Sequence, residues 1–341
     1  MSFIENIKEL AKLDIKTIVL PEGTDERVLK GGIKAIEEGY AKVIFVGNEK
    51  EILSLAKENN IDSEKLQIID PTKSTKTEEY AKMLFELRKS KGMTEEQAKS
   101  LVLDSVYYSM IMLKNGEADG VVSGAIHSTS DTLRPALQIV KTAPETKLVS
   151  AFFVMVTNTK YGNDGVLVFG DCGLNENPDS DGLSEIAKSS ADSFEQFTGR
   201  KAKVAMLSYS TYGSAKSSLT EKVVEATRLV KEKYPNIDVD GELQLDAAIV
   251  ESVGNKKAPG SSVAGKANVL IFPDLNAGNI GYKLVQRFGN AEAYGPLCQG
   301  IAKPVNDLSR GCSSDDVAGV IAFTAVQAQN NVRKEIGKWK F

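Results

Sequence analysis

Short apolar runs alternate with longer amphipathic stretches along the first third of the chain. The run TIVLPEG predicts a strand, DERVLKGGIKAIEEG has apolar residues at helical spacing, and AKVIFVGN predicts a second strand. Asp25 is placed to cap this helix, and Gly39 is placed to end it. Two later stretches, EEYAKMLFELRKSKG and TEEQAKSLVLDSVYYSMIMLKNG, each predict a helix, and DGVVSGAI predicts a strand.

The middle of the chain departs from this rhythm and then returns to it. Two apolar runs, LVSAFFVMVTN and GVLVFGDCG, are joined by TKYGND, whose Asn163, Asp164 and Gly165 predict the turn of a β-hairpin. Strands are then predicted in KVAMLSYS and NVLIFPD, and helices in LSEIAKSSADSFEQF, SLTEKVVEATRLVKEKY, GNIGYKLVQRFG and SSDDVAGVIAFTAVQAQ. This alternation indicates α/β architecture with mainly parallel sheets, in which ligands bind beyond the carboxyl ends of strands.

Length and charge narrow the function classes. A chain of 341 residues exceeds one typical core and predicts two domains. Its net charge of −4 and isoelectric point of about 5.4 provide no basic field for a polyanion, which argues against nucleic-acid binding. A small anionic ligand stays possible, because one pocket can be positive on an acidic protein.

The numbers of cysteines and histidines indicate the cellular compartment and whether a metal site is expected. Three cysteines without a C-x-x-C pair argue against a disulfide scaffold and fit a reducing cytoplasm. The start MSFIENIKELAKLD is unlike a signal peptide, and no apolar run approaches the roughly 20 residues that span a bilayer. With a single histidine, a transition-metal site has little support, and we expect neither a metal nor a bound cofactor.

The segment GSSVAGKA, residues 260–267, approaches the phosphate-binding motif G-x-x-x-x-G-K-[ST] but fails it twice. Ala267 lacks the hydroxyl that would hold magnesium, and the segment leads into a predicted strand where the motif requires a helix. The chain also lacks an early G-x-G-x-x-G and a G-x-S-x-G.

The segment SGAIHSTSDTLRP, residues 123–135, gathers small polar side chains directly after a predicted strand. Its hydroxyl donors are Ser128, Thr129, Ser130 and Thr132. Arg134 adds a planar cation that suits phosphate oxygens. The same segment also suits a helix start, with Ser128 or Ser130 as the N-cap and Pro135 early in the helix. Both interpretations can hold, because a helix N-terminus is itself an anion site. His127 is interpreted as fixing loop geometry.

A second polar segment, PVNDLSRGCSSDD, occupies residues 304–316 before an apolar helix. Its polar side chains include Asn306, Asp307, Ser309, Arg310, Cys312 and Asp316. Ser313 with Asp316 three residues later resembles a capping box. A carboxylate beside an arginine also suits general-base work on a thiol, so both interpretations stay open.

A third segment, FPDLNAGNIGYKLVQRFG, follows the strand that ends at Asp274. Asparagines and glycines lead into a helix that carries Tyr282, Lys283 and Arg287. The glycines permit tight turns or close approach of a ligand. For Lys283 and Arg287 taken individually, a solvated helix face is the favoured interpretation.

Together, SGAIHSTSDTLRPALQIVKT, FPDLNAGNIGYKLVQRFG and PVNDLSRGCSSDDV resemble the phosphate acetyl/butyryl transferase family. The segments come in the family's order, and the resemblance covers essentially the whole chain, in the short form without extra N-terminal domains. It implies phosphate acetyltransferase activity: reversible transfer of an acetyl group between acetyl phosphate and coenzyme A, in acetate metabolism. Coenzyme A is then a substrate rather than a bound cofactor.

The resemblance also implies an architecture. It gives two α/β/α domains with a cleft between them, of the isocitrate/isopropylmalate dehydrogenase-like class. Residues 1–148 and 305–341 would form the first domain, and residues 149–304, with the hairpin, an inserted second domain. It further implies a cytoplasmic homodimer that acts on small molecules, without nucleic-acid or membrane partners.

The resemblance assigns roles to residues of this sequence. Asp316 would deprotonate the thiol of coenzyme A, while Ser309 and Arg310 would lie at the reacting carbonyl and phosphate. Arg134 would hold the phosphate or stabilise the leaving group. Further residues assigned to phosphate or acetyl binding are Ser128, Thr129 and Asn306, and those assigned to coenzyme A are Arg88, Tyr282 and Lys283.

Several rival hypotheses remain at this point. The chain could be a phosphate butyryltransferase with a longer acyl pocket, or a non-catalytic module that binds acyl-CoA for regulation. A dehydrogenase of similar fold is a third option. A ping-pong route through an acetylated Cys312 or Cys172 is a mechanistic alternative to direct transfer in a ternary complex.

Overall fold

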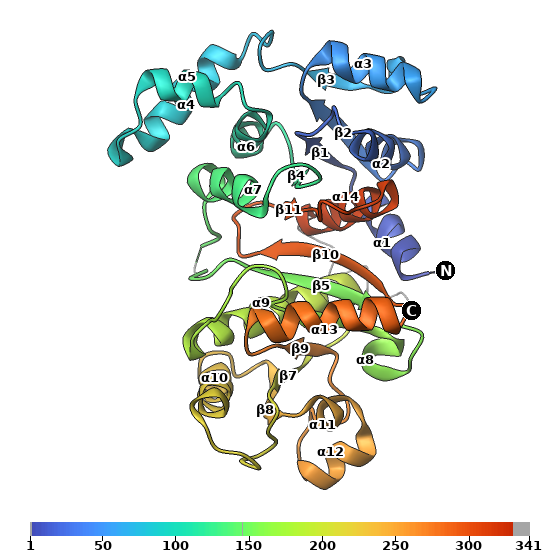
Figure 1. Cartoon of the computed structure of the whole chain (residues 1–341), viewed down its shortest axis with the longest axis vertical. Coiled ribbons are helices and arrows are strands. Elements are labelled where there is room, and N and C mark those ends of the chain that lie inside the picture. The colour runs from blue at the N-terminus through green and yellow to red at the C-terminus, as the bar shows by residue number, and fades with distance from the viewer. Residues whose placement is uncertain (1, 145, 330–341) are drawn as a thin grey trace. The chain divides into compact units, whose positions relative to one another are not determined.

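The computed structural model describes residues 2–144 and 146–329 of the chain. The chain divides into two compact units, and the described residues of the first are 2–144 and 301–329. Those of the second are 146–300. Each unit has its own sheet covered by helices (Figure 1), as the alternating pattern predicts.

The sheet of the first unit has five strands in the order β11-β4-β1-β2-β3, and every neighbouring pair is parallel. The strands are β1 (Lys16–Leu20), β2 (Ala41–Val46), β3 (Gln67–Ile69), β4 (Gly120–Ser123) and β11 (Val305–Asp307). β11 therefore joins the edge of this sheet from a part of the chain that follows the whole second unit. Side chains alternate along β1, so that Val19 packs into the cluster around α4 to α6 while Leu20 approaches α2.

Helices lie on both sides of this sheet, with α2 and α14 on one side and α4 to α6 on the other (Figure 1). The helices are α1 (Phe3–Lys12), α2 (Glu26–Glu37), α3 (Glu49–Glu58), α4 (Thr77–Arg88), α5 (Glu95–Leu101), α6 (Ser105–Asn115), α7 (Thr129–Pro135) and α14 (Ser314–Ala328). Short helical turns are η1 (Ser63–Lys65), η2 (Lys89–Lys91) and the π-helical η3 (Ala136–Val140). α2 and α14 approach closely because Gly31 has no side chain: a Cβ there would lie 2.6 Å from Cβ of Val317.

Local capping explains where these helices begin and end. Asp25 caps α2, accepting hydrogen bonds from the amides of Arg27 and Val28, as predicted. Gly39 follows the helix with a φ of +74° and ends it, also as predicted. The stretch 94–116, predicted as one helix, forms two, because the carboxylate of Asp104 caps a new start at α6.

The sheet of the second unit has six strands in the order β10-β5-β6-β9-β7-β8. The strands are β5 (Ser150–Val156), β6 (Val166–Gly170), β7 (Lys203–Leu207), β8 (Asp238–Leu243), β9 (Val269–Ile271) and β10 (Glu292–Gln299). β5 and β6 pair antiparallel as the predicted hairpin, and its turn takes Asp164 and Gly165 to φ values of +51° and +93°. β6, β9, β7 and β8 run parallel.

The helices of the second unit connect these strands. They are α8 (Tyr161–Asp164), α9 (Ser180–Thr198), α10 (Ser218–Lys233), α11 (Leu245–Ile249), α12 (Glu251–Lys257) and α13 (Leu275–Phe288). The segment 260–267 leads into β9 and not into a helix, which confirms that it is no nucleotide-binding loop.

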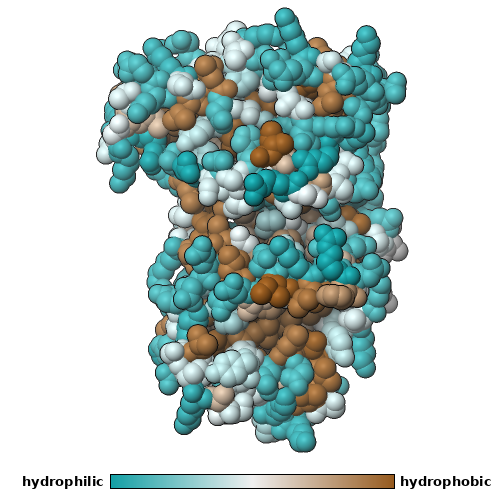
Figure 2. All heavy atoms as spheres, viewed as in Figure 1, coloured by the Kyte–Doolittle hydropathy of each residue, from teal (hydrophilic) through white to brown (hydrophobic). Residues whose placement is uncertain are grey.

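Apolar side chains reach the surface of the second unit on α13. Ile280, Leu284 and Phe288 recur every four residues, and Phe288 is 87% exposed. Figure 2 shows apolar surface where Figure 1 places this helix. Within the described residues, no helix has the length and apolar character needed to cross a membrane.

Candidate functional site

Three loops meet at the carboxyl edge of the first unit's sheet, because β1, β4 and β11 are neighbours that run in the same direction. Two contacts join the loops after β4 and β11. The amide of Leu308 donates to the carbonyl of Ser123 at 2.7 Å, and the hydroxyl of Thr129 donates to Oδ2 of Asp307 at 2.6 Å. The two polar segments that the sequence singled out, 178 residues apart at this contact, therefore lie side by side.

The loop after β4 leads into α7 through Ser128. Its hydroxyl accepts from the amide of Asp131 at 3.2 Å and donates to Oδ2 of Asp131 at 2.7 Å, so the capping interpretation holds for Ser128. Pro135 ends α7 and does not lie early in it, which corrects that prediction. Pro135 has no N–H to donate to the carbonyl of Asp131, and after it the chain proceeds as the π-helical turn η3.

A buried carboxylate fixes the backbone of the loop between β4 and α7. Glu22, just after β1, is 1% exposed and accepts from the amides of Ala125, Ile126 and His127 at 2.8, 3.0 and 2.9 Å. Its Oε1 also bonds Nδ1 of the His127 ring at 2.7 Å. Burial favours a raised pKa for Glu22, but these hydrogen bonds outweigh it and hold the pKa below its ordinary value.

The hydrogen bond to Glu22 raises the pKa of His127 above its ordinary value, against the opposing effect of burial. His127 therefore fixes the loop, as predicted, and carries positive charge more readily. Its ring borders a cavity of about 120 Å³ lined by Asp104, Tyr107, His127, Asp131, Arg134 and Pro135. The side chain of Arg134 is exposed and has no hydrogen-bond or ion-pair partner among the described residues.

The loop after β11 presents Ser309 and Arg310 to solvent. The hydroxyl of Ser309 accepts from the amide of Gly311 at 3.3 Å. In the part of the chain that the structure describes, nothing accepts a hydrogen bond from the guanidinium of Arg310. An exposed arginine without a partner keeps its fork available for an anion.

The loop ends in the capping box that the sequence predicts. Ser313 donates to Oδ2 of Asp316 from its amide at 2.8 Å and from its hydroxyl at 2.9 Å. These two bonds orient the exposed carboxylate of Asp316 through one oxygen. Its other oxygen, Oδ1, has no donor within the described chain.

Two polar side chains of this segment turn inward. Asn306 is fully buried, and its amide nitrogen donates to Thr324 at 2.8 Å and to Gln327 at 2.6 Å, so the structure does not bring it to the loop surface. Asp307 is 2% exposed, and its Oδ1 lacks a hydrogen-bond partner in the described structure. Burial raises the pKa of Asp307 to about 6.

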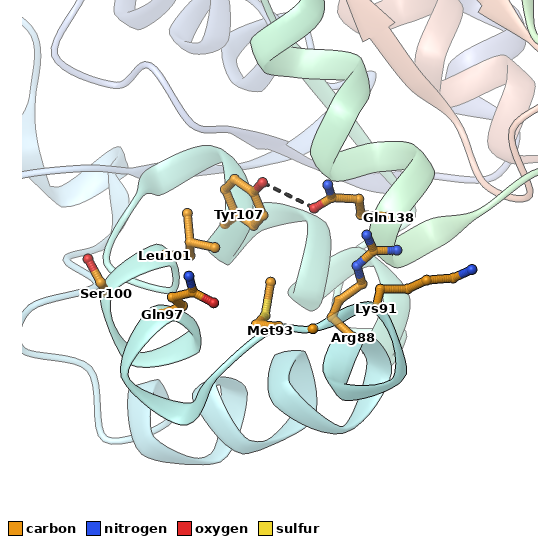
Figure 3. Close-up of a pocket in the computed structure, with 9 residues that line it drawn as sticks. Arg88, Lys91, Met93, Gln97, Ser100, Leu101, Tyr107 and Gln138 are labelled. Carbon is orange, nitrogen blue, oxygen red and sulfur yellow. Dashed lines mark hydrogen bonds between the residues drawn. The ribbon is translucent and has the colours of Figure 1, made fainter.

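A larger cavity opens beside the first, and Tyr107 lines both. Its volume is about 540 Å³, and its walls are Arg88, Lys91, Gly92, Met93, Gln97, Ser100, Leu101, Tyr107 and Gln138. Figure 3 shows Arg88 and Lys91 at one end of this cavity and Ser100 at the other. The hydroxyl of Tyr107 donates to Oε1 of Gln138 at 3.1 Å. Met93 and Leu101 add apolar surface to a lining that is otherwise mostly polar or charged.

The remaining predicted site residues, Tyr282 and Lys283, lie on α13 of the second unit. The Tyr282 ring stacks on Phe153, with centroids 4.0 Å apart and planes at 16°, and so packs against the core of that unit. Lys283 lies over the Tyr282 ring at 5.8 Å. Their binding of coenzyme A stays a prediction.

The cysteines that could carry an acyl group are poorly suited to it. Cys172 is fully buried and Cys312 is 7% exposed. Burial raises the pKa of the Cys172 thiol well above its ordinary value and that of Cys312 to about 11. Little thiolate is therefore available at either position near neutral pH.

Sequence reasoning missed two residues of this edge, Glu22 and Arg27. Arg27 donates to the carbonyls of Arg310, Cys312 and Ala125, and so touches both polar loops. The signal available was their place: both follow the carboxyl end of a predicted buried strand, where such sheets bind ligands.

Comparison with known proteins bears on the whole chain. The family model described as Phosphate acetyl/butaryl transferase matches residues 2–325. A phosphate acetyltransferase of Acetivibrio thermocellus is 64% identical over 330 residues, covering 96% of this chain and 99% of that protein. One of Clostridium acetobutylicum is 53% identical, with 97% and 100% covered.

Solved structures agree with these sequence matches. A phosphotransacetylase from Streptococcus pyogenes superposes with a TM-score of 0.90 at 41% identity, covering 96% of this chain and 99% of that chain. The EutD phosphotransacetylase from Staphylococcus aureus gives 0.87 at 46% identity, with 96% and 98% covered. A 4-hydroxythreonine-4-phosphate dehydrogenase-like protein from Salmonella typhimurium, at 10% identity and a TM-score of 0.54, shares the fold alone.

Proposed function

The chain belongs to the phosphate acetyl/butyryl transferase family and is an acyltransferase, and we propose that its reaction is the reversible transfer of an acetyl group between acetyl phosphate and coenzyme A. Relatives 45–64% identical to it carry the name phosphate acetyltransferase. The observation that carries the proposal is the pair of adjacent polar segments, one ending in α7 with Arg134 and the other in the loop with Arg310, whose exposed arginines have no partner among the described residues.

The phosphate half of acetyl phosphate binds to cationic and hydroxyl groups of these loops. Arg134 and Arg310 supply forks that match phosphate oxygens, while Ser309 and Thr129 supply hydroxyl groups. As the thiol attacks the acetyl carbonyl, negative charge grows on the carbonyl oxygen and on the departing phosphate. A fixed donor at such a position is worth about 3–4 kcal/mol of barrier.

Asp316 is the general base for the thiol. A thiol with a pKa near 8.5 is mostly protonated at neutral pH, so a positioned carboxylate raises the rate by roughly 10²–10⁴-fold. The capping bonds to Oδ2 hold the carboxylate in one orientation and leave Oδ1 to receive the proton. Capping and catalysis, which the sequence left as alternatives, thus use different oxygens of one side chain.

The acetyl group moves directly from phosphate to sulfur in a ternary complex. A ping-pong route would need a cysteine thiolate, and burial raises the thiol pKa of both Cys172 and Cys312. The thiol of coenzyme A is not buried in this way, so direct attack by that thiol avoids the need for a cysteine thiolate.

The nucleotide end of coenzyme A occupies the 540 Å³ cavity. Arg88 and Lys91 provide positive charge for its phosphates, and the apolar side chains of Met93 and Leu101 suit a purine ring (Figure 3). Tyr107 lines both this cavity and the one bordered by Arg134. The extended arm of coenzyme A can therefore run from one cavity to the other.

An assay that follows the absorbance of the acetyl-CoA thioester in the presence of phosphate tests the proposal. The wild type should turn over, and Asp316→Ala should lose about 10²-fold or more in kcat with little change in either KM, because general-base assistance is made mainly in the transition state. Asp315→Ala is the matched control, since Asp315 lies beside Asp316 on α14 and pairs with Lys34. Binding of acetyl-CoA without turnover would instead identify a regulatory module.

Acyl preference is tested in the same assay with butyryl-CoA. We expect a higher kcat/KM for acetyl-CoA, and a clear butyryl preference would make the protein a phosphate butyryltransferase. We further propose a cytoplasmic homodimer, whose mass in light scattering should be twice that of the 36.8 kDa chain.

A further inference from the structure

The guanidinium of Arg27 has an acceptor for every one of its five hydrogens. Nε donates to Oδ1 of Asp25 at 3.0 Å, and Nη2 donates to Oδ2 of Asp25 at 2.8 Å and to the carbonyl of Ala125 at 2.9 Å. Nη1 donates to the carbonyl of Arg310 at 2.7 Å and to that of Cys312 at 3.2 Å. Since an arginine has five donors and no acceptor, none remains for a ligand.

We propose that Arg27 is a positioning residue for acyl transfer: it sets the backbone of the loop that presents Ser309 and Arg310, and fixes that loop against the one that carries His127 and leads into α7. The inference rests on the proposed function for its kinetic consequence. Its structural part is that Arg27 keeps the backbone of residues 309–312 in one fixed conformation, and this part stands without the proposed function.

The loop after β11 has few contacts of its own. Residues 309–311 are exposed, and within the loop the amide of Cys312 donates to the carbonyl of Ser309 at 2.9 Å. Gly311 has nothing closer than 3.8 Å to the position of a Cβ, so its surroundings do not confine it. Fixing the backbone of these residues costs conformational entropy, and the contacts within the loop alone do little to offset it.

Arg27 supplies what the loop lacks. Its two bonds through Nη1 hold the carbonyls of Arg310 and Cys312, so the peptide groups 310–311 and 312–313 are both fixed from one point. The side chain of Arg310 then starts from a defined backbone. A group aimed at developing charge contributes fully only when it is held in place beforehand.

The same guanidinium sets the distance between the two loops. Ala125 is held through its amide by Glu22 at 2.8 Å and through its carbonyl by Arg27 at 2.9 Å. Arg27 therefore connects a segment fixed by the buried Glu22 to a segment with little support of its own. One acyl phosphate can bridge the two loops only at the separation that this connection defines.

Asp25 orients Arg27 in turn. Its carboxylate accepts from two nitrogens of the guanidinium while also capping α2 through the amides of Arg27 and Val28. This two-point contact fixes the plane of the fork, which a lysine ammonium cannot reproduce. Arg27→Lys keeps the positive charge but cannot form the two-point contact with Asp25 or donate to all three carbonyls.

The first experiment compares wild type, Arg27→Lys and, as the matched control, Arg228→Lys. Arg228 also forms a two-point contact with a glutamate, Glu225, but on the exposed face of α10. A displacement near 1 Å costs about 10²-fold, so Arg27→Lys should lower kcat by about 10- to 100-fold and change the KM for coenzyme A and acetyl phosphate by less than about threefold. Arg228→Lys should match the wild type.

Amide hydrogen exchange provides a readout that does not depend on activity. In Arg27→Lys, the amides of residues 309–313 should exchange faster while β1 and β4 keep their protection. In Arg27→Ala, added ethylguanidinium should restore part of kcat and of this protection, whereas propylammonium should not. General loss of stability would not be repaired by a guanidinium salt.

Three results would overturn the inference. They are an Arg27→Lys enzyme with wild-type kcat, a raised KM at unchanged kcat, which would make Arg27 a ligand of the substrate, and unchanged exchange at 309–313. A wild type without acetyl transfer would refute the proposed function instead, and the exchange measurement would still decide whether Arg27 orders the loop.

Discussion

Replacing Glu22 with glutamine changes one atom of a buried side chain and leaves its shape almost intact. In the wild type, Oε2 accepts from Ala125 and Oε1 accepts from the amides of Ile126 and His127 and from the His127 ring. The glutamine has only one accepting oxygen. Its NH₂ group must replace either Oε1 or Oε2, and there it faces at least one N–H group that has lost its acceptor.

The cost follows from these contacts. One buried N–H left without an acceptor costs about 1–3 kcal/mol, and each remaining bond loses about 1 kcal/mol when its acceptor becomes neutral. We therefore expect Glu22→Gln to lower the free energy of unfolding by about 4–6 kcal/mol, a large share of the roughly 5–15 kcal/mol typical of a domain. Because the loop that carries His127 and leads into α7 with Arg134 loosens, kcat should fall as well.

Urea unfolding at pH 7 measures the effect, with Glu26→Gln as the control. Glu26 is exposed on α2 and pairs with Lys30, so its replacement should cost less than about 1 kcal/mol. The folded-state pKa of Glu22 lies below its ordinary value of 4.5, so its contribution is present above pH 4.5 and is lost as the pH falls through the lowered value. A loss below about 1 kcal/mol at pH 7, or a difference from wild type that persists in acid, would refute the reasoning.

Three further outcomes test other parts of the site. His127 is the only histidine, so NMR can follow its titration directly: its pKa should lie above 6.5, and its contribution to stability should be complete below pH 6.5 and disappear as the pH rises through the folded-state value. Glu22→Gln should abolish this elevation. Cys172→Ala and Cys312→Ala should keep kcat within about threefold of wild type if neither cysteine is the nucleophile, and a loss equal to that of Arg310→Ala would restore the ping-pong route. Asp307 has a pKa raised to about 6, so the folded chain binds its proton more tightly than the unfolded chain and stability falls as the pH rises from about 4 to about 6; Asp307→Asn should remove this slope in urea titrations, and an unchanged slope would contradict the assignment.

The elements that the sequence predicted well are those whose apolar pattern is long or whose ends carry a strong cap. The hairpin of β5 and β6 and the start of α2 at Asp25 are examples. β10 was missed because its sequence, EAYGPLCQ, lacks the alternation of a half-buried strand and contains a proline. β11 was missed because three residues carry no period, and only the neighbouring β4 makes them a strand.

For the site, residue type was readable from the sequence and side-chain direction was not. Asn306 and Ser309 looked alike as polar residues of one loop, yet Asn306 belongs to β11 and points into the core beneath α14. The capping box of Ser313 and Asp316 was predictable because it depends on a spacing of three residues. Arg27 was not, because its bonds to the carbonyls of Arg310 and Cys312 span 283 and 285 positions and involve backbone atoms, which every residue has.

The late arrival of β11 and α14 imposes an order on how the molecule is made. As the chain leaves the ribosome, residues 146–300 are complete and contiguous, so the second unit can fold while the first still lacks its last strand and helix. Until residues 301–329 emerge, β4 has an open edge and the apolar surface that α14 covers faces water. A nascent chain interrupted at residue 300 would thus contain one finished half and one half exposed to aggregation, and it would lack Asp316, the proposed general base.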